Sequence, residues 1–472
     1  MNKHPLALLP ELCLLIGAVA TLLTGSFLAR DRQWIARLVA AGALLASVVL
    51  ALPTVAERGT IYAHSYALDA ATGTARLLVP LAALLVVGLA AGRVSGNRRE
   101  TEFYALTLLA TLGAVLLAGA SDLLLLAMAY LLSSMPLSGL TGWGRDRRGA
   151  EGALKLYLFG ALLGIALLAG VAVLTGVGGG ATDYDRLAAG LSAAPRAAVA
   201  VGVVGVLAGL LFKIGAVPAH FWVPDAVQGA TIPVGALLTT IPKIGGLLAV
   251  YRLLDVAVPV DVVDWPLLVA VVAALSMTLG NFAAFAQTDP RRLLAYSTIS
   301  QVGYLLLAVA VAGRADRALP ALLVYLIGYA VTNLGAFAVL AAEPHDTLDD
   351  YRGLVRRRPW LAAALAICLL GLVGTPPTAV FAGKLLVFTA AWDGGMAWLV
   401  AVAAANTVAS LFYYLRWLVP AFSLGQAAGG ATRPAGQGRS ISLVTVVSAT
   451  AALLATAGAV PVYRLVEQTL QR

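Results

Sequence analysis

The sequence predicts an all-α polytopic membrane protein of about fourteen transmembrane helices. Apolar residues make up 60% of the 472 residues and charged residues only 12%, whereas a soluble domain carries roughly 25% charged residues. Apolar runs of about 20 residues, each long enough to cross a ~30 Å hydrocarbon core, recur along the whole chain. The polar stretches between these runs are too short for a soluble domain. Residues 1–472 are therefore expected to form a single membrane domain.

Polar breaks between the apolar runs place the helices in chain order. We expect helices at about 8–28, 36–55, 72–92, 102–119, 122–142, 152–176, 197–222, 228–254, 264–286, 292–312, 317–342, 359–389, 396–421 and 441–463. The seventh ends in Lys213–Pro218, and the twelfth carries Gly374–Pro377 in its middle. Proline removes a backbone donor and clashes with the preceding turn, so we expect both helices to be broken.

Broken helices at corresponding positions of two halves are typical of transporters built from inverted repeats. Irregular backbone at membrane depth survives only where protein or water satisfies its polar groups. We therefore expect two inverted five-helix repeats, formed by helices 4–8 (about 102–254) and helices 9–13 (about 264–421). Flanking helices would occupy 8–92 and 441–463.

The distribution of basic residues indicates the orientation of the chain in the membrane. The net charge is +9, but the excess is mostly arginine in alternate short loops, which indicates membrane topology rather than nucleic-acid binding. The arginine-rich loops lie near 30–37, 93–99, 145–148, 291–292, 352–358 and 433–439. The positive-inside rule places them in the cytoplasm. Both termini are then predicted on the outer side of a bacterial plasma membrane.

Cysteine and histidine usage argues against a metal or cofactor site in this chain. Cys13 and Cys368 lie singly inside apolar runs, and the four histidines have no metal-ligand spacing. We expect no haem, iron–sulfur cluster or zinc site here. Glu11 interrupts the first apolar run, which is also long, so we expect this segment to stay as a helix rather than be cleaved as a signal.

Lysine at membrane depth is the most informative chemistry in the sequence. Its insertion costs roughly 2.5–3.5 kcal/mol, yet Lys155, Lys213, Lys243 and Lys384 all lie within predicted spans. Arginine stays protonated almost always, whereas a buried lysine can lose its proton. Lys213 and Lys384 adjoin the two breaks, and Lys243 follows a proline in an apolar helix. The pattern favours these lysines as proton-relay groups.

Two of the relay candidates have a plain alternative. His220 lies beside the first break, where it is either a relay histidine or a packed core residue. Lys155 lies near the arginine-rich end of its helix, where it either takes part in the relay or extends its charge to the membrane surface.

Five segments carry long, specific motifs: Phe212–Pro233, Ile241–Lys243, Asp289–Tyr304, Gly374–Lys384 and Asn406–Arg416. They resemble, in order, the broken seventh helix, the eighth-helix lysine, the join of helices nine and ten, the broken twelfth helix and the thirteenth helix of the antiporter-like membrane subunits of respiratory complex I. The similarity covers nearly the whole chain. Within that family, the opening Leu9–Leu12, the segment Glu151–Lys155 and an end after fourteen helices favour the subunit N branch.

The resemblance implies a membrane-arm subunit that couples electron transfer from NADH to quinone to proton translocation. NADH, FMN, iron–sulfur clusters and quinone would bind to partner subunits, and neighbouring membrane-arm subunits would flank this chain. Carried over to this sequence, Lys213 would be the modulated lysine, Lys243 a central relay, and Lys384 the connection towards the outside.

One departure from the family pattern bears on this mechanism. The family has a fifth-helix glutamate that pairs with the seventh-helix lysine, and Leu131 stands at that position here. Gln228 and Ser138 replace a usual acid and a usual tyrosine. A buried lysine without a carboxylate sheds its proton more readily. We therefore hypothesise a divergent paralogue with altered or absent pumping.

Three other functions share features of this pattern. A cation/proton antiporter subunit, or the related part of a membrane hydrogenase, would have the same lysines and differ only in its partners. A structural subunit that no longer conducts would explain Leu131. A solute transporter outside this superfamily would not explain lysines beside helix breaks.

Overall fold

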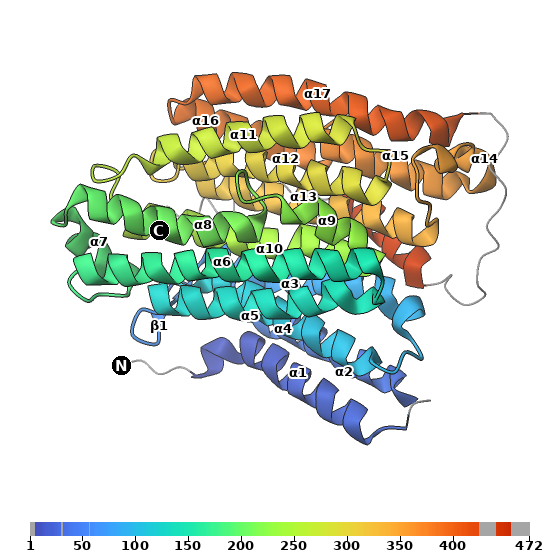
Figure 1. Ribbon diagram of the computed structural model, residues 1–472, viewed down its shortest axis with the longest axis horizontal. Coiled ribbons are helices and arrows are strands. Elements are labelled where there is room, and N and C mark those ends of the chain that lie inside the picture. The colour runs from blue at the N-terminus through green and yellow to red at the C-terminus, as the bar shows by residue number, and fades with distance from the viewer. Residues whose placement is uncertain (1–4, 30–31, 56, 424–439, 455–472) are drawn as a thin grey trace.

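The computed structural model describes residues 5–29, 32–55, 57–423 and 440–454 of the chain. These residues form a bundle of long helices that run in roughly one direction, with the loops at its two ends (Figure 1). Twelve helices of the described part are long and apolar enough to cross a membrane, and two more apolar helices, Pro359–Val373 and Ser440–Leu454, are shorter. The prediction of an all-α polytopic protein is confirmed.

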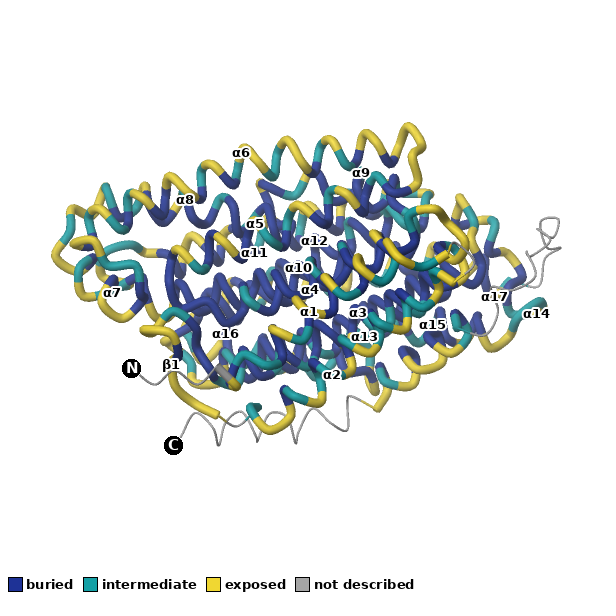
Figure 2. The backbone as a smooth tube through the Cα atoms, turned by 90° about the horizontal axis from the view of Figure 1, so that it is seen from below, coloured by how far each residue is buried: buried dark blue, intermediate teal, exposed yellow. Residues whose placement is uncertain are grey.

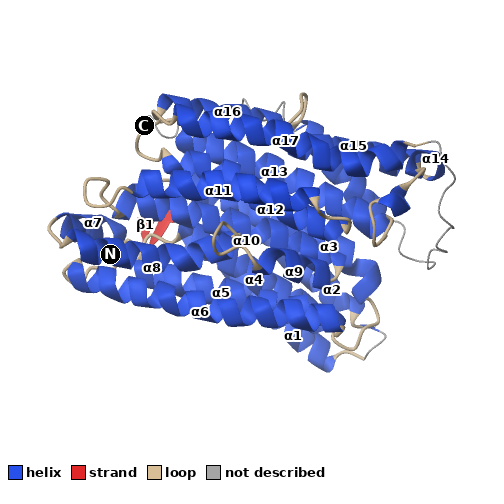
Figure 3. Ribbon diagram, turned by 45° about the horizontal axis from the view of Figure 1, so that its top comes forward, coloured by secondary structure: helices blue, strands red, loops and turns tan. Residues whose placement is uncertain are grey.

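Three long helices come first in the chain, with a small hairpin between the second and third in sequence. The hairpin lies at one end of the bundle (Figure 3). The helices are α1 (Leu9–Phe27), α2 (Trp34–Ala51) and α3 (Ala70–Val94). Strands β1 (Gly59–Ile61) and β2 (Tyr66–Leu68) pair antiparallel. The sequence did not predict this hairpin, because two three-residue strands are too short to show an alternating pattern.

Two runs of helices follow. The first consists of α4 (Glu100–Gly119), α5 (Leu123–Thr141), α6 (Arg147–Val177), α7 (Tyr184–Ser192), α8 (Arg196–Ile214), α9 (Trp222–Gly229) and α10 (Ile232–Arg252). The second consists of α11 (Trp265–Phe285), α12 (Pro290–Ala310), α13 (Ala318–Ala342), α14 (Leu354–Arg357), α15 (Pro359–Val373), α16 (Ala379–Asp393) and α17 (Ala397–Phe422). The short α7 was not predicted. Asp183 caps its first turn, and Leu187 and Leu191 are buried. The fourteenth predicted helix is described only over Ser440–Leu454.

Burial divides the bundle into a closed centre and an outer ring (Figure 2). Every residue of α10 is buried, and α12 and α13 are buried over nearly their whole length. A helix that is apolar on all sides belongs in such a centre. The outer helices α1, α2, α6 and α17 instead expose large apolar side chains along one face. That exposed face suits lipid or a neighbouring membrane subunit.

Both predicted helix breaks are present and share one design. α8 ends at Gly215 (φ +77°) and α15 ends at Gly374 (φ +88°), a left-handed conformation that glycine adopts without steric cost. A cis-proline peptide follows each glycine, at Pro218 and at Pro377. The chain then resumes as α9 and α16. Each break therefore leaves free backbone carbonyls inside the bundle.

Two buried arginines, Arg76 and Arg252, were not predicted from the sequence. Arg76 on α3 donates to both carboxylate oxygens of Glu11 on α1, at 2.7 and 3.0 Å. Arg252 at the end of α10 pairs with Asp69, the N-cap of α3, at 2.5 Å. Burial alone would raise the pKa of Asp69, but the charge and hydrogen bonds of Arg252 outweigh it and lower that pKa. Both pairs fasten α3 to the rest of the protein.

Candidate functional site

Lys213 lies in the last turn of α8, directly before the first break. The residue is buried, and its Nζ donates a 2.5 Å hydrogen bond to Ser134 Oγ on α5. The same Nζ lies 5.0 Å from the centre of the Tyr130 ring, within the range of a cation–π contact. The hydrogen-bond partner of this lysine is thus a neutral hydroxyl. No carboxylate of the described residues forms an ion pair with it.

Lys243 is held by an acceptor that a proline creates. Pro242 has no N–H, so the carbonyl four residues earlier lacks its helical donor. That carbonyl belongs to Leu238, and Lys243 Nζ donates to it at 2.9 Å. The ammonium also lies 4.9 Å from the ring centre of Trp222, at the start of α9. The lysine is fully buried, and its local partners are again uncharged.

Lys384 binds the second break in the same way. Its Nζ donates to Val373 O at 2.8 Å, and Val373 is the last residue of α15. Carbonyls at a helix C-terminus lack helical donors and carry partial negative charge, which favours a cation there. The ammonium lies 4.0 Å from the ring centre of Tyr304. A Cβ at Gly374 would come within 2.8 Å of Lys384 Cδ, so the break glycine makes room for the side chain.

Polar groups on α10, α12 and α13 form two hydrogen-bonded clusters, each of which reaches the carbonyl next to the acceptor of Lys243 or of Lys384. Tyr329 donates to Thr239 O at 2.6 Å and lies 3.1 Å from Thr298 Oγ1. One turn further along α12, Gln301 accepts from Tyr325 at 2.6 Å and donates to Leu372 O at 2.8 Å. Leu372 and Val373 are adjacent carbonyls at the end of α15. The two clusters consist of side-chain hydroxyls, the amide of Gln301 and the backbone carbonyls of Thr239 and Leu372.

A second set of polar side chains lies near Lys384, between α11, α12 and α17. Thr407 Oγ1 lies 3.2 Å from the hydroxyl of Tyr304, the ring beneath the lysine. Tyr413 donates to Asn281, and Asn281 donates to Asn406. Further members are the Ser297–Tyr414 pair at 2.5 Å and Thr278 beside Asn406. Tyr304 therefore lies between Lys384 and this second set of polar side chains.

Lys155 does not belong to the buried series of Lys213, Lys243 and Lys384. It is 36% exposed and forms 2.6 Å ion pairs with Glu151 on its own helix and with Asp225 on α9. Asp225 also binds Arg292 of α12 at 2.7 Å. The structure thus places Lys155 in a charged network at the arginine-rich end, where it links α6, α9 and α12.

His220 lies in the segment between α8 and α9 and is partly buried. Its Nδ1 is enclosed without a hydrogen-bond partner. Phe221 lies beside its ring, and none of the lysines forms a hydrogen bond with it among the described residues. His220 therefore stays a relay prediction that rests on its position beside the break.

Two of the three departures from the family pattern, Leu131 and Gln228, have distinct surroundings. Leu131 is 41% exposed on α5, one turn before the Ser134 that binds Lys213. Gln228 donates to Asp289 at 2.9 Å and accepts from Arg292 at 3.0 Å. An ionised acid at position 228 could not donate to Asp289. The amide therefore suits its place between an acid and a base.

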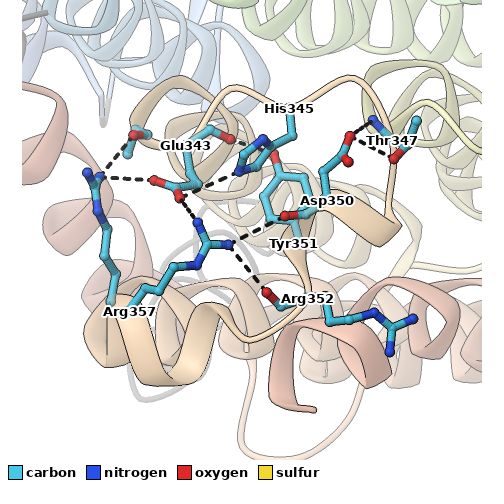
Figure 4. A network of polar contacts seen from close by, with 9 residues as sticks. Glu343, His345, Thr347, Asp350, Tyr351, Arg352 and Arg357 are labelled. Atoms are coloured by element: carbon cyan, nitrogen blue, oxygen red, sulfur yellow. Dashed lines mark hydrogen bonds and ion pairs between the residues drawn. The ribbon is translucent and has the colours of Figure 1, made fainter. Parts of the chain in front are cut away.

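A further charged network covers the loop after α13 (Figure 4). The Glu343 carboxylate lies 3.1 Å from both Arg357 and Arg358 and 3.5 Å from His345. Tyr351 donates to the backbone oxygen of Glu343 at 2.8 Å. This network joins α13 to α14 and α15 at the arginine-rich end of the bundle.

Glu343 should make the stability of this end sensitive to acid. Burial alone would raise the pKa of Glu343, but His345 and the charges of Arg358 and Arg357 outweigh it and lower that pKa. The stabilisation is complete above the ordinary glutamate pKa of about 4.3 and is lost as pH falls through the lower folded value. Glu343→Gln should cost about 1–3 kcal/mol at pH 7 and less at pH 3. Thermal midpoints measured across this range check it, with exposed Asp349→Asn as the control; equal midpoint losses at both pH values would contradict it.

The fold and the lysine series define a class of protein: a multi-pass membrane subunit with titratable groups at the breaks of its helices. Residues 120–410 match the family model described as NADH:quinone oxidoreductase/Mrp antiporter, transmembrane. The chain is 53% identical to NADH-quinone oxidoreductase subunit N 1 of Streptomyces griseus over 94% of each chain. It is 51% identical to subunit N of a Mycobacterium species over 98% of each. A chain of respiratory complex I from Thermus thermophilus superposes with a TM-score of 0.81 at 32% identity, covering 94% of this chain and 97% of that one.

This chain belongs to the NADH-quinone oxidoreductase subunit N family. It is a membrane-arm subunit of the respiratory enzyme. The resemblance inferred from the five motifs is confirmed.

Proposed function

We propose that this chain translocates protons across the membrane with Lys213, Lys243 and Lys384 as its titratable groups. One observation carries the proposal: each of these buried ammonium groups donates to a neutral oxygen, and two of the three acceptors are carbonyls freed by a proline or a helix break. Such a lysine can release its proton without leaving behind an unpaired carboxylate. It can also take a proton back without moving far.

We take the order of transfer from the family resemblance. Lys213 would receive the proton beside Ser134, Lys243 would pass it on, and Lys384 would release it towards the outer side. The hydroxyl and amide groups between Lys243 and Lys384 can orient water but are not themselves easily ionised. In this proposal, His220 assists at the first break, and Lys155 couples the relay to the charged network around Asp225.

We further propose the arrangement of the chain in its membrane. The arginine-rich end faces the cytoplasm of a bacterium, and both termini lie on the outer side of the plasma membrane. Residues of about 102–254 and 264–421 act as two inverted repeats. The shared design of the two breaks supports this, because in each a helix ends in a left-handed glycine and the chain resumes as a new helix.

The redox chemistry belongs to partner subunits in this proposal. NADH, FMN, iron–sulfur clusters and quinone bind there, and neighbouring membrane-arm subunits cover the exposed apolar faces of the bundle. The relatives named as subunit N of NADH-quinone oxidoreductase support this over an independent cation/proton antiporter or a membrane hydrogenase subunit.

A non-conducting structural subunit is the second candidate. It is favoured by Leu131 at the position where the family has an acid, and by the neutral hydroxyl that Lys213 binds instead. The two candidates differ in whether Lys213 must change its protonation state during turnover.

Lys213→Ala in the complete oxidoreductase, reconstituted into proteoliposomes, separates the two candidates. Under the pumping proposal, fewer protons should cross per NADH oxidised. Leu131→Glu should favour the charged form of Lys213 and move the alkaline limb of the pumping profile to higher pH. Leu131→Gln, similar in shape but uncharged, is the matched control. Unchanged proton stoichiometry in Lys213→Ala would leave the structural candidate, and equal profiles for the Glu and Gln variants would show that position 131 does not reach Lys213.

A further inference from the structure

A polar cavity of about 270 Å³ opens at the arginine-rich end of the bundle, away from the lysine series. The C-terminal ends of α3, α9 and α13 and the starts of α6, α10 and α12 surround it. Its basic lining consists of Arg93, Arg291 and His345, and its backbone lining of the segment 229–232. These elements come from both helix runs and from the N-terminal part. The cavity therefore lies where three parts of the protein meet.

Arg93 is the unexplained group in this cavity. It lies in the last turn of α3 and is partly buried, with its Nε enclosed and without a hydrogen-bond partner. No residue of the described part forms a hydrogen bond or ion pair with its guanidinium. Its charged neighbour is another cation, Arg291, whose Nε is likewise enclosed and unpartnered but whose Nη2 pairs with Asp289 at 3.2 Å. A guanidinium without an anionic partner, as in Arg93, is costly to bury.

The carboxylates of the cavity have partners other than Arg93. Asp146 accepts from Gly149 N as the N-cap of α6, at 2.6 Å. Asp346 is 92% exposed and lies 3.7 Å from Arg291. Neither pairs with Arg93. Arg93 is thus the cation of the cavity lining that these carboxylates leave unpaired.

Backbone N–H groups at the start of α10 add positive potential to the cavity beside Arg93. The 21-residue helix α10 begins at the cavity, and its N-cap Thr231 makes no side-chain capping bond. The first-turn N–H groups of a helix have no intrahelical acceptor, and the helix dipole places partial positive charge there. Such a terminus binds phosphate readily, and arginine is the side chain best suited to the same group.

We propose that this cavity binds a phosphate group, with Arg93 and Arg291 as its cationic ligands and the N-terminus of α10 as its backbone ligand. The phosphate belongs either to an anionic phospholipid headgroup or to a free anion. Basic pockets between transmembrane helices at the cytoplasmic surface bind lipid headgroups. The bound anion would join α3, α10 and α12 across the boundary between the parts of the protein.

The test compares Arg93→Gln with Arg98→Gln in the complete, purified oxidoreductase. Arg98 is an exposed arginine five positions further along the chain, so the two variants lose the same charge from the same region. Electron cryo-microscopy maps should show density between Arg93 and the start of α10 in the wild type and in Arg98→Gln, and none in Arg93→Gln. Thermal midpoints are titrated with inorganic phosphate against chloride at equal ionic strength. They are also titrated with dioleoyl phosphatidylglycerol against dioleoyl phosphatidylcholine.

Stabilisation by phosphatidylglycerol alone assigns a lipid headgroup, and stabilisation by inorganic phosphate assigns a free anion. In either case the half-saturating concentration should rise about tenfold or more in Arg93→Gln and stay unchanged in Arg98→Gln. Arg93→Lys keeps the charge without the planar fork, and should give a smaller loss if the glutamine variant does not assemble. Equal density and equal titrations for Arg93→Gln and Arg98→Gln would overturn the proposal. So would an empty wild-type cavity that responds to neither probe.

Discussion

Replacing Lys384 with methionine is expected to slow proton transfer through this subunit about 100-fold. Lys384 is buried at the second break, and its Nζ binds only Val373 O and the face of Tyr304 among the described residues. Without the amine, the proton would have to cross this region as an unpaired charge. A charge at membrane depth costs about 2.5–3.5 kcal/mol, and each 1.36 kcal/mol in a barrier is a factor of ten in rate.

Lys384→Arg makes the experiment specific for proton release. Arginine keeps the positive charge and can reach the same carbonyl, but it is effectively always protonated. If the charge at this place is only structural, the arginine variant should pump like the wild type. If the amine must lose its proton in each cycle, the arginine variant should fail as completely as the methionine variant.

The measurement is the number of protons moved per NADH oxidised, in proteoliposomes that contain the complete oxidoreductase. Thr389→Val on the same helix controls for changes to α16 that leave Lys384 in place. Wild-type stoichiometry in Lys384→Met would refute the role of this lysine. Wild-type stoichiometry in Lys384→Arg alone would reduce that role to a fixed charge.

The helix breaks and the lysines beside them could be predicted because proline and glycine act locally. Pro218, Pro376 and Pro377 each restrict their own backbone, and a lysine in an apolar run is visible without knowing its neighbours. The hydrogen-bond acceptor of Lys243 could also have been predicted from the sequence. Pro242 lacks an N–H, so the carbonyl of Leu238 has no helical donor. This carbonyl lies five residues before the lysine that binds it.

The partners of buried groups could not be predicted in the same way. Ser134 lies 79 positions from Lys213, and Glu11 lies 65 positions from Arg76. Alternating topology places helix ends on one side or the other, but it does not say which helices are neighbours. The unpaired Arg93 illustrates the same limit, because a missing partner is visible only when all surrounding elements are in place.

The largest effect on stability is expected at the buried pair of Glu11 and Arg76. Arg76 is 1% exposed and Glu11 is 4% exposed. Tyr66 donates to the same carboxylate at 2.6 Å, and Arg76 also donates to Ala7 O at 2.7 Å. The pair therefore ties α1, the hairpin and α3 together. Removing one member leaves the other charge buried without a partner.

Glu11→Ala should destabilise the attachment of α1 by about 3–5 kcal/mol, the usual loss when one member of a buried ion pair is removed. Glu11→Leu combined with Arg76→Met should recover much of this loss, because it removes the stranded cation together with the acid. The loss thus measures the cost of an unpaired guanidinium, and the recovery separates it from lost packing around position 11.

The two cysteines of the chain supply the readout for this experiment. Cys13 lies on α1, two positions after Glu11, and Cys368 is buried within α15. If α1 detaches, a maleimide reagent should label Cys13 faster in Glu11→Ala than in the wild type, while Cys368 stays protected. Equal labelling rates for Cys13 in both proteins would show that other contacts hold α1 in place. Faster labelling of both thiols would indicate that the whole bundle depends on this pair, because in the described part of the chain no hydrogen bond or ion pair joins α15 to Glu11.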